Sequence, residues 1–333
     1  MSPRLAGHAA AAVTIAIWTC FIVIARGAAQ RTLGPFDLSM ARVLGASLVL
    51  LPWGWWLVRQ GGANGPRSLF GLSPLSLRLT ALTGTFGGLG YALLVYSGFF
   101  FAPATHASVL MPGSLPLWTT LLAAAVLGDR ITPARAVGLA LILAGDLLVG
   151  GASLLHAFDG GEVWKGDLLF MCAALCWAVY TVLARRHGVD PVRSTIAVTV
   201  FAFFTYVPVY ALLMATDTVP SRLFTAPLGE VVFHMLFQGV GSVVVSGITF
   251  MKMIQYFGPV RSTMMTSVVP GLSALGAVLL LGEPLHWNLL AGLALVTAGI
   301  VFGVRRAAPP VSVAASFHPT AAAGAGAACA KGL

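Results

Sequence analysis

Long apolar runs, separated by short stretches of charged, glycine and proline residues, make up most of this sequence. Each run is close to or above the roughly 20 residues that an α-helix needs to cross the hydrocarbon core of a bilayer. The runs lack the strict alternation of barrel strands, and helices satisfy their own backbone groups in lipid. We therefore predict an all-α membrane protein with ten transmembrane helices, at residues 8–29, 38–58, 75–100, 104–127, 134–151, 166–184, 194–214, 229–256, 261–281 and 286–304.

The composition agrees with this prediction and excludes a soluble domain. Of the 333 residues, 58% are hydrophobic and 9% are charged, with a mean hydropathy of +0.91, whereas a soluble domain carries about 25% charged residues. The net charge is +9, but no basic stretch interleaved with aromatic residues points to a nucleic acid. Four cysteines show no metal-ligand spacing, so neither a metal site nor a cofactor is expected.

The positions of the basic residues predict the orientation of the helices. Fourteen of the 19 lysine and arginine residues fall in the two termini, in the loops after the second, fourth, sixth and eighth helices, or within five residues of the helix ends beside those loops. Basic residues collect on the cytoplasmic side of a membrane. We therefore expect a multi-pass protein of a bacterial cytoplasmic (inner) membrane with both termini in the cytoplasm. Residues 307–333, rich in Ala, Gly and Pro, are expected to be a disordered cytoplasmic tail.

Motifs from the first half of the chain recur in the second half. The matching positions are Trp18, Ala25 and Arg26 with Trp177, Ala184 and Arg185, Gly128-Asp129 with Gly282-Glu283, and Gly138 and Gly145 with Gly292 and Gly299. These matches predict two repeats of five helices, residues 1–151 and 152–306. Because five is odd, the second repeat enters the membrane in the opposite direction. Inverted repeats of this kind are typical of transporters, whose two halves rock around a site at mid-membrane depth.

The chain also resembles a known family. The resemblance rests on the tryptophan in the first helix of each half, Arg42, the stretch from Tyr91 to Pro116, and the GDRIT and GEPLH segments at Gly128 and Gly282. Together these are similar to the EamA family of the drug/metabolite transporter superfamily, over about residues 8–304. The resemblance implies a ten-helix carrier of small metabolites, often amino acids or their derivatives. Such carriers often move their solutes out of the cell. It also implies a central cavity lined mainly by helices one, three, four, six, eight and nine. The second half departs from the first at Val198, which stands where Arg42 is expected.

Aromatic and polar residues within those helices are the candidates for binding a solute. Trp18 and Trp177 lie near the middle of their helices, where they either pack in the core or line the solute path. Lys252 can attract a carboxylate or extend to the interface. The candidate cavity residues are Trp18, Tyr91, Tyr96, Trp118, Trp177, Tyr180, Lys252 and Gln255.

Charged residues inside or near the helix ends are the candidates for coupling and gating. Asp146 is the carboxylate that lies well inside a helix, and its counterpart in the second half is Ile300. A carboxylate at that depth is costly and therefore suggests a function. Asp37 is expected to pair with Arg26 or Arg42, as a structural ion pair or as an outer gate. Asp129 and Glu283 are expected to help end their helices, with gating as the alternative.

These features favour a secondary active transporter that exports small organic metabolites by alternating access. Its partners are then a small-molecule solute, the lipid bilayer and a proton or ion gradient, with no nucleic acid. A channel or a facilitative permease is the alternative. An intramembrane enzyme is a distant third, because the sequence holds no HExxH zinc pair, no GxSxG turn and no pair of aspartates near the middle of the helices.

Overall fold

The computed structural model describes residues 3–60 and 67–305 of the chain. These residues are helical, without a named strand among them. The predicted tail, 307–333, lies outside the described residues. The helices are α1 (Pro3–Ala29), α2 (Pro35–Gln60), α3 (Leu77–Gly84), η1 (Thr85–Leu89), α4 (Gly90–Phe101), α5 (Ala104–Ser108), η2 (Val109–Gly113), α6 (Leu115–Leu127), α7 (Pro133–His156), η3 (Ala157–Asp159), α8 (Val163–Arg186), α9 (Pro191–Ala215), α10 (Leu228–His234), η4 (Met235–Val245), α11 (Ser246–Met265), η5 (Thr266–Val268), α12 (Val269–Leu281) and α13 (Trp287–Arg305).

Ten membrane spans are formed from these elements, as predicted. Within the described residues, eight helices are long and apolar enough to cross a membrane, and two shorter apolar helices, Thr266–Leu281 and Trp287–Gly303, complete the set. The third, fourth and eighth spans each contain a π-helical segment, η1, η2 and η4. A π-helical turn inserts an extra residue, so it changes which face of a helix the following side chains occupy.

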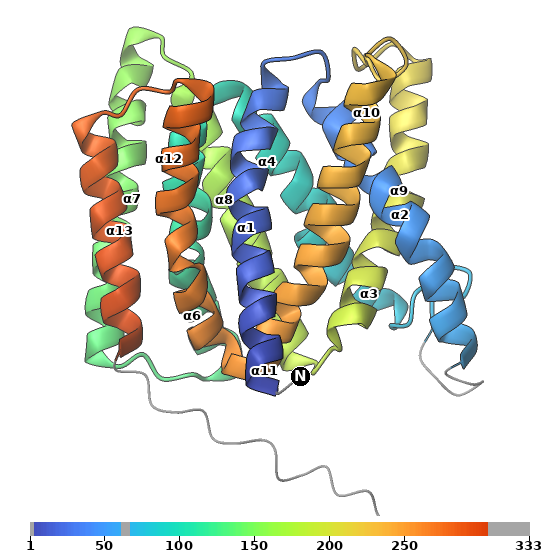
Figure 1. Cartoon of the computed structure of the whole chain (residues 1–333), viewed down its shortest axis with the longest axis horizontal. Helices are drawn as coiled ribbons and strands as arrows, with labels where there is room; N and C mark the ends of the chain where they lie inside the picture. The colour runs from blue at the N-terminus through green and yellow to red at the C-terminus, as the bar shows by residue number, and fades with distance from the viewer. Residues whose placement is uncertain (1–2, 61–66, 306–333) are drawn as a thin grey trace, which may run out of the picture.

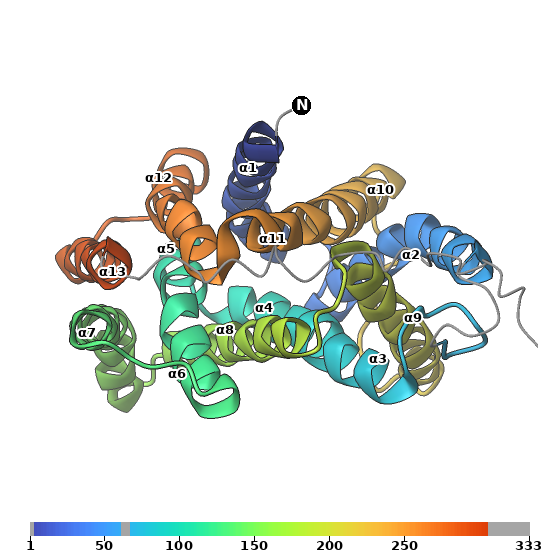
Figure 2. The ribbon, with the colours of Figure 1, turned by 90° about the horizontal axis from the view of Figure 1, so that it is seen from below.

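The spans form two rows whose contacts follow the repeat. Viewed along the helices, α13, α12, α1 and α11 lie along one side, and α7, α6, α8 and α3 along the other (Figure 2). The first span of each half packs against the third and fourth spans of the other half, since α1 contacts α11 and α12 while α8 contacts α4 and α6. The two five-helix halves are therefore joined reciprocally, as an inverted repeat requires.

The fourth span of each half ends in the same way. Gly128 after α6 and Gly282 after α12 have positive φ angles, of 71° and 67°, which glycine adopts without steric cost. The next amide, that of Asp129 or Glu283, donates to the carbonyl six residues earlier. This helix ending fixes the place of an acidic residue at each end of the bundle, and α6 and α12 end at opposite ends in Figure 1.

Glycines allow close contacts between the halves. A Cβ atom on Gly145 of α7 would lie 2.7 Å from the carbonyl oxygen of Gly292 on α13, and one on Gly138 would lie 2.6 Å from that of Gly299. The recurring glycine motif thus forms the α7–α13 interface, where α7 and α13 lie side by side at one edge (Figures 1 and 2). Small residues permit such close approach of helices in membranes.

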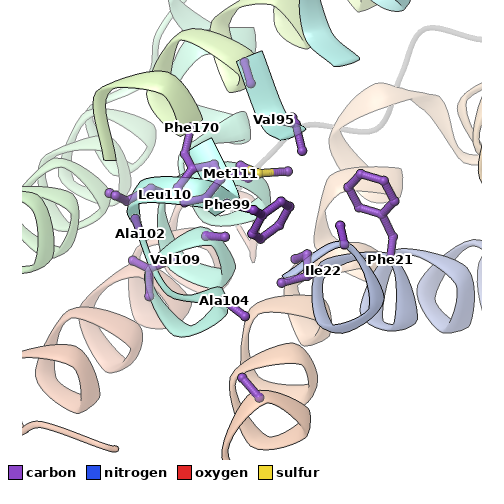
Figure 3. Close-up of a cluster of buried hydrophobic side chains, with 14 of the residues drawn as sticks. Phe21, Ile22, Val95, Phe99, Ala102, Ala104, Val109, Leu110, Met111 and Phe170 are labelled. Atoms are coloured by element: carbon purple, nitrogen blue, oxygen red, sulfur yellow. The ribbon is translucent and has the colours of Figure 1, made fainter. Parts of the chain in front are cut away.

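The largest apolar core joins spans from both halves. Phe21 on α1, Phe99 on α4 and Phe170 on α8 are buried and come together with smaller side chains (Figure 3). The rings of Phe99 and Phe170 pack edge to face with centroids 5.0 Å apart, an arrangement that aromatic pairs favour. This core supports one side of the cavity described next.

Candidate functional site

A cavity lies between the two halves at the middle of the bundle. Its lining residues come from spans one, two, three, four, six, eight and nine: Trp18, Phe21, Ile22, Arg42, Tyr91, Met111, Pro112, Leu115, Ala174, Trp177, Ser242, Ser246 and Val269. Apolar and aromatic side chains dominate the wall, with few polar groups, as in sites for small organic molecules. Within the described chain, no group of three His, Cys, Asp or Glu residues is arranged to hold a metal.

Three of the predicted aromatic residues meet in this cavity. The rings of Trp18 and Trp177, equivalent residues of the two halves, have centroids 6.1 Å apart at an angle of 83°. Tyr91 packs on Trp177 with centroids 4.9 Å apart. Nε1 of Trp18 donates to Oγ of Ser246 over 3.3 Å, whereas Nε1 of Trp177 is buried without a hydrogen-bond partner among the described residues.

Arg42 brings a positive charge to the same cavity. Its side chain is 6% exposed. Nη1 donates to Oγ of Ser242 over 3.0 Å and to the carbonyl oxygen of Gln238 over 3.4 Å. The guanidinium also lies 5.7 Å from the ring centroid of Phe21 and 6.0 Å from that of Tyr91. Within the described part of the chain, Arg42 forms no salt bridge with a carboxylate.

Close packing of α2 on η4 positions Arg42. A Cβ atom on Gly239 of η4 would lie 2.7 Å from the Cα atom of Gly45 on α2, so the two backbones touch at this point. Arg42 is one helical turn before Gly45, and its side chain therefore reaches Ser242, about one turn beyond Gly239. Gln238, Ser242 and Ser246 recur every four residues, a spacing that indicates one helix face and that the sequence interpretation overlooked.

Three other predicted residues are absent from the cavity lining, of which Tyr96 and Tyr180 are buried and Trp118 is partly buried. The hydroxyl of Tyr96 donates to Oε1 of Gln238 over 3.1 Å. The hydroxyl of Tyr180 shares a hydrogen bond of 2.8 Å with Oγ of Ser194. Nε1 of Trp118 is buried without a partner among the described residues. These side chains support the cavity wall and pack between spans.

Lys252 and Gln255 lie away from the cavity. Both side chains on α11 are exposed, and neither lines the pocket that holds Trp18 and Arg42. Lys252 follows Ser246 by almost two turns along α11. The cation nearest the aromatic residues is therefore Arg42, on a different span from the one that the sequence suggested.

The sequence suggested that Asp37 pairs with Arg26 or Arg42. In the structure, Asp37 instead accepts hydrogen bonds that organise a loop. Its Oδ1 accepts hydrogen bonds from the hydroxyls of Tyr210 and Ser221, over 2.5 and 2.8 Å. Its Oδ2 accepts from the backbone amides of Gly34 and Arg222, each over 3.0 Å. Asp37 thus holds the start of α2 to the segment that follows α9.

Arg26 and Glu283 form an ion pair at the upper end of the bundle, the end at which α1 and α12 finish in Figure 1. Nε of Arg26 lies 3.3 Å from Oε1 of Glu283, and their side chains are 20% and 7% exposed. Nη1 of Arg26 also donates to the carbonyl oxygen of Phe99. The Glu283 carboxylate accepts from the amides of Ala104 and Thr105, over 2.8 and 2.9 Å. This carboxylate thus joins α1, α5 and α12.

The repeat equivalents of these two residues, Arg185 and Asp129, form an ion pair at the lower end of the bundle. Nη1 of Arg185, which ends α8, lies 2.7 Å from Oδ2 of Asp129, which follows α6. Nη2 donates to Oδ1 over 3.3 Å, so the pair is bidentate. These side chains are 40% and 35% exposed. Arg26 corresponds to Arg185 and Glu283 to Asp129 in the repeat, and each pair therefore joins the first span of one half to the fourth span of the other.

Asp146 is buried in α7, directly after Gly145 of the glycine contact with α13. The residue is 4% exposed, and neither carboxylate oxygen has a hydrogen-bond partner among the described residues. It does not line the central cavity. An unpartnered carboxylate at this depth is costly.

A second buried carboxylate, Asp167 on α8, was not singled out from the sequence. Oδ1 of Asp167 lies 2.9 Å from Nδ1 of His106, and Oγ of Ser153 donates to Oδ2. The group connects α5, α7 and α8 near the upper end. Asp167 follows a loop in the sequence, and only the folded arrangement reveals that it is buried.

Comparison with known proteins places this architecture in a family. An uncharacterized transporter of Archaeoglobus fulgidus is 30% identical over 206 residues, which cover 60% of this chain and 64% of the archaeal protein. A probable amino-acid metabolite efflux pump of Salmonella typhimurium is 28% identical over 242 residues, or 70% of this chain and 78% of the pump. An aromatic amino acid exporter of Ancylobacter novellus is 28% identical over 152 residues, or 46% of this chain and 44% of the exporter. The aligned part is thus less than two thirds of the archaeal relative.

The fold is also found among solved structures. One crystal structure superimposes with a TM-score of 0.58 and 23% sequence identity, covering 92% of this chain and 99% of the other. A sequence profile of the EamA-like transporter family matches residues 5–151 and again residues 164–305. The two matches coincide with the two five-helix halves, and this integral membrane protein therefore belongs to the EamA-like transporter family.

Proposed function

We propose that this protein is a secondary active transporter that exports small organic metabolites, such as amino acids or their derivatives, by alternating access. The observation that carries the proposal is the equivalence of two ion pairs, Arg26–Glu283 and Arg185–Asp129, which lie at opposite ends of the bundle with the cavity between them. A carrier needs a site that opens to one side at a time, and inverted repeats supply two equivalent gates.

Each ion pair can act as such a gate because it joins the two repeats. When Arg185 and Asp129 separate, α8 and α6 are free to part at the lower end while Arg26 and Glu283 still hold the upper end. Exchange of these two states exposes Trp18, Tyr91 and Trp177 to each side in turn. Two ends held by different side chains do not need to open together, which is the requirement that separates a carrier from a channel.

The orientation in the membrane is part of this proposal. Basic residues are concentrated in the loops at the lower end and in the terminal segments, so the lower end faces the cytoplasm of a bacterial inner membrane. Residues 1–151 and 152–306 are the two repeats, with both termini in the cytoplasm. A proton or ion gradient supplies the energy, and Asp146 is the candidate coupling residue because its buried carboxylate is unpartnered among the described residues.

The proposed solutes follow from the relatives and from the cavity wall. Two of the relatives are named as an amino-acid metabolite efflux pump and as an aromatic amino acid exporter. An aromatic wall formed by Trp18, Tyr91 and Trp177 suits an apolar or aromatic body. Small organic metabolites with such a body are therefore the first solutes to test.

The test is solute counterflow in proteoliposomes. Vesicles that hold the full chain are loaded with amino acids, purine derivatives or cationic drugs in turn, and uptake of the same labelled compound is followed with and without a pH gradient. We expect saturable exchange that is accelerated by solute on the opposite side. Single-channel currents, or flux that does not saturate and shows no counterflow, would contradict the carrier mechanism and favour a channel. Empty vesicles control for leakage.

A further inference from the structure

The charge on Arg42 has no opposite charge in the described part of the protein. The side chain is 6% exposed and lines the central cavity. No described carboxylate lies within salt-bridge distance of it, although Arg26 and Arg185 each have one. A buried guanidinium is costly inside a membrane protein unless it is paired, and unpaired ionisable groups at this depth usually serve a ligand or an ion.

The contacts of Arg42 orient the guanidinium without neutralising it. Its hydrogen bonds go to the neutral oxygens of Ser242 and Gln238, and both leave from Nη1. The rings of Phe21 and Tyr91 stabilise the cation by a quadrupole interaction, at 5.7 and 6.0 Å. The Tyr96 hydroxyl is a further hydrogen-bonding neighbour of the guanidinium. A guanidinium carries five N–H donors in a planar fork, so N–H donors beyond these contacts remain for the two oxygens of a carboxylate.

The rest of the cavity determines what such a carboxylate is attached to. Trp18, Tyr91 and Trp177 cover the space next to the guanidinium, and no aspartate or glutamate is among the lining residues. A solute with an anionic head and an apolar or aromatic body matches this wall. An ammonium group on the solute would find no carboxylate among the lining residues. Aromatic rings and the hydroxyls of Ser242 and Ser246 are the groups available to it there.

From this arrangement we infer that Arg42 is the anion-binding residue of the carrier, and that its solutes are organic acids with an apolar or aromatic body that pair with Arg42 through a carboxylate. The inference rests on the proposed function and narrows its substrate class. It also assigns the role of the anion-binding cation to a residue of one repeat alone, because Val198 occupies the equivalent position.

Direct binding to the purified full chain tests the inference with pairs of compounds that differ only at the head group. The probes are phenylalanine, leucine and 3-phenylpropanoate, each compared with its primary amide, and binding is followed by the tryptophan fluorescence of the protein. We expect at least one acid to bind about 10- to 100-fold more tightly than its amide. In Arg42→Gln this preference should disappear, and Arg42→Lys should recover part of it, because an ammonium lacks the bidentate fork.

The matched control is Arg59→Gln, on the same helix. Arg59 stacks on Trp55 at 3.9 Å and lies outside the cavity, so its replacement should leave the preference for acids unchanged. Size-exclusion chromatography of each variant shows whether it is folded, and Arg42→Lys keeps the test open if Arg42→Gln does not fold.

The outcomes separate this inference from the proposed function. Exchange of a solute in proteoliposomes, together with amides that bind as tightly as acids or an acid preference that survives in Arg42→Gln, would overturn the role of Arg42 and leave the carrier intact. Acids that bind through Arg42 but are never exchanged would support the role of Arg42 and contradict the carrier. Absence of binding by every acid in the panel would overturn the inference as well.

Discussion

Nε of Arg26 lies 3.3 Å from Oε1 of Glu283, and the residues equivalent to these two, Arg185 and Asp129, form the corresponding pair at the opposite end of the bundle. The ion pair between the two repeats therefore occurs twice, once at each end of the bundle. Whatever separates α1 from α12 at one end has a counterpart that separates α8 from α6 at the other. In the proposed alternating-access mechanism, the same kind of contact would therefore close each end in turn.

The pair at the lower end can be tested by exchanging its charges. Asp129→Arg and Arg185→Asp each place two like charges in contact, so each single variant should slow solute counterflow several-fold. The double variant restores attraction and should recover much of the rate. The coupling free energy of an exposed pair is about 0.2–1 kcal/mol. A double variant no better than either single variant would show that the pair does not act as a gate.

The pair at the upper end should contribute more to stability. Glu283→Gln removes the charge that faces Arg26 and leaves one oxygen in place of the two that accept the amides of Ala104 and Thr105. We expect the free energy of unfolding to fall by about 1–3 kcal/mol, measured by thermal or denaturant unfolding in detergent. The matched control is Asp129→Asn, whose side chain is 35% exposed and whose loss should cost about 1 kcal/mol or less. Equal losses would contradict this difference.

The glycine contact between α7 and α13 predicts opposite effects of one substitution at two positions. A Cβ atom on Gly145 would lie 2.7 Å from the carbonyl oxygen of Gly292, whereas one on Gly150 of the same helix would meet nothing within 4 Å. Gly145→Ala should therefore destabilise the protein by about 1–3 kcal/mol. Gly150→Ala should be neutral or stabilise it by up to about 1 kcal/mol, because alanine favours helix. The two melting temperatures in detergent check the prediction.

The paired tryptophans predict a loss of affinity without a loss of folding. Trp18→Ala combined with Trp177→Ala removes two rings from the cavity wall and one hydrogen bond to Ser246. We expect the solute concentration for half-maximal counterflow to rise at least tenfold, in a protein that still elutes as a single species from size-exclusion chromatography. Undiminished affinity in the folded double variant would show that the aromatic residues serve packing alone.

If Asp146 couples transport to a proton gradient, its replacement should affect solute accumulation and leave solute exchange intact. Asp146→Asn keeps the size of the side chain and removes the group that can carry a proton. Counterflow should persist, whereas accumulation driven by a pH gradient should be lost. Asp159→Asn, an exposed change at the end of the same span, serves as the control. Gradient-driven accumulation that is unchanged in Asp146→Asn would exclude this residue from coupling.

Much of the fold could be predicted from the sequence because lipid imposes simple rules on it. Apolar runs of sufficient length gave ten spans, and the predicted limits, such as 104–127 and 38–58, lie within a few residues of the observed Ala104–Leu127 and Pro35–Gln60. The repeat was visible because glycine and acidic residues recur where helices end. These features depend on local composition, which a single sequence contains.

The site was predicted less completely because it depends on which helix faces which. Trp18, Tyr91 and Trp177 were expected in the cavity and line it, whereas Lys252 was named as a possible partner of a carboxylate and Arg42 as a coupling or gating residue, and Arg42 lines the cavity while Lys252 does not. Arg26 was expected to meet Asp37, which is close in the sequence, and instead meets Glu283. The pairing follows from the inverted docking of the repeats, which sequence spacing alone does not describe.

The two ion pairs differ in how far water reaches their side chains. At 20% and 7% exposure, Arg26 and Glu283 are largely withdrawn from water, whereas Arg185 and Asp129 remain open to competing water and salt. Water and salt weaken an exposed ion pair more than a shielded one, so in the proposed carrier the lower end should open more often than the upper end when no solute is bound. In the proposed orientation, with the lower end in the cytoplasm, this difference would favour loading from inside the cell, and a rise in ionic strength there should increase the bias.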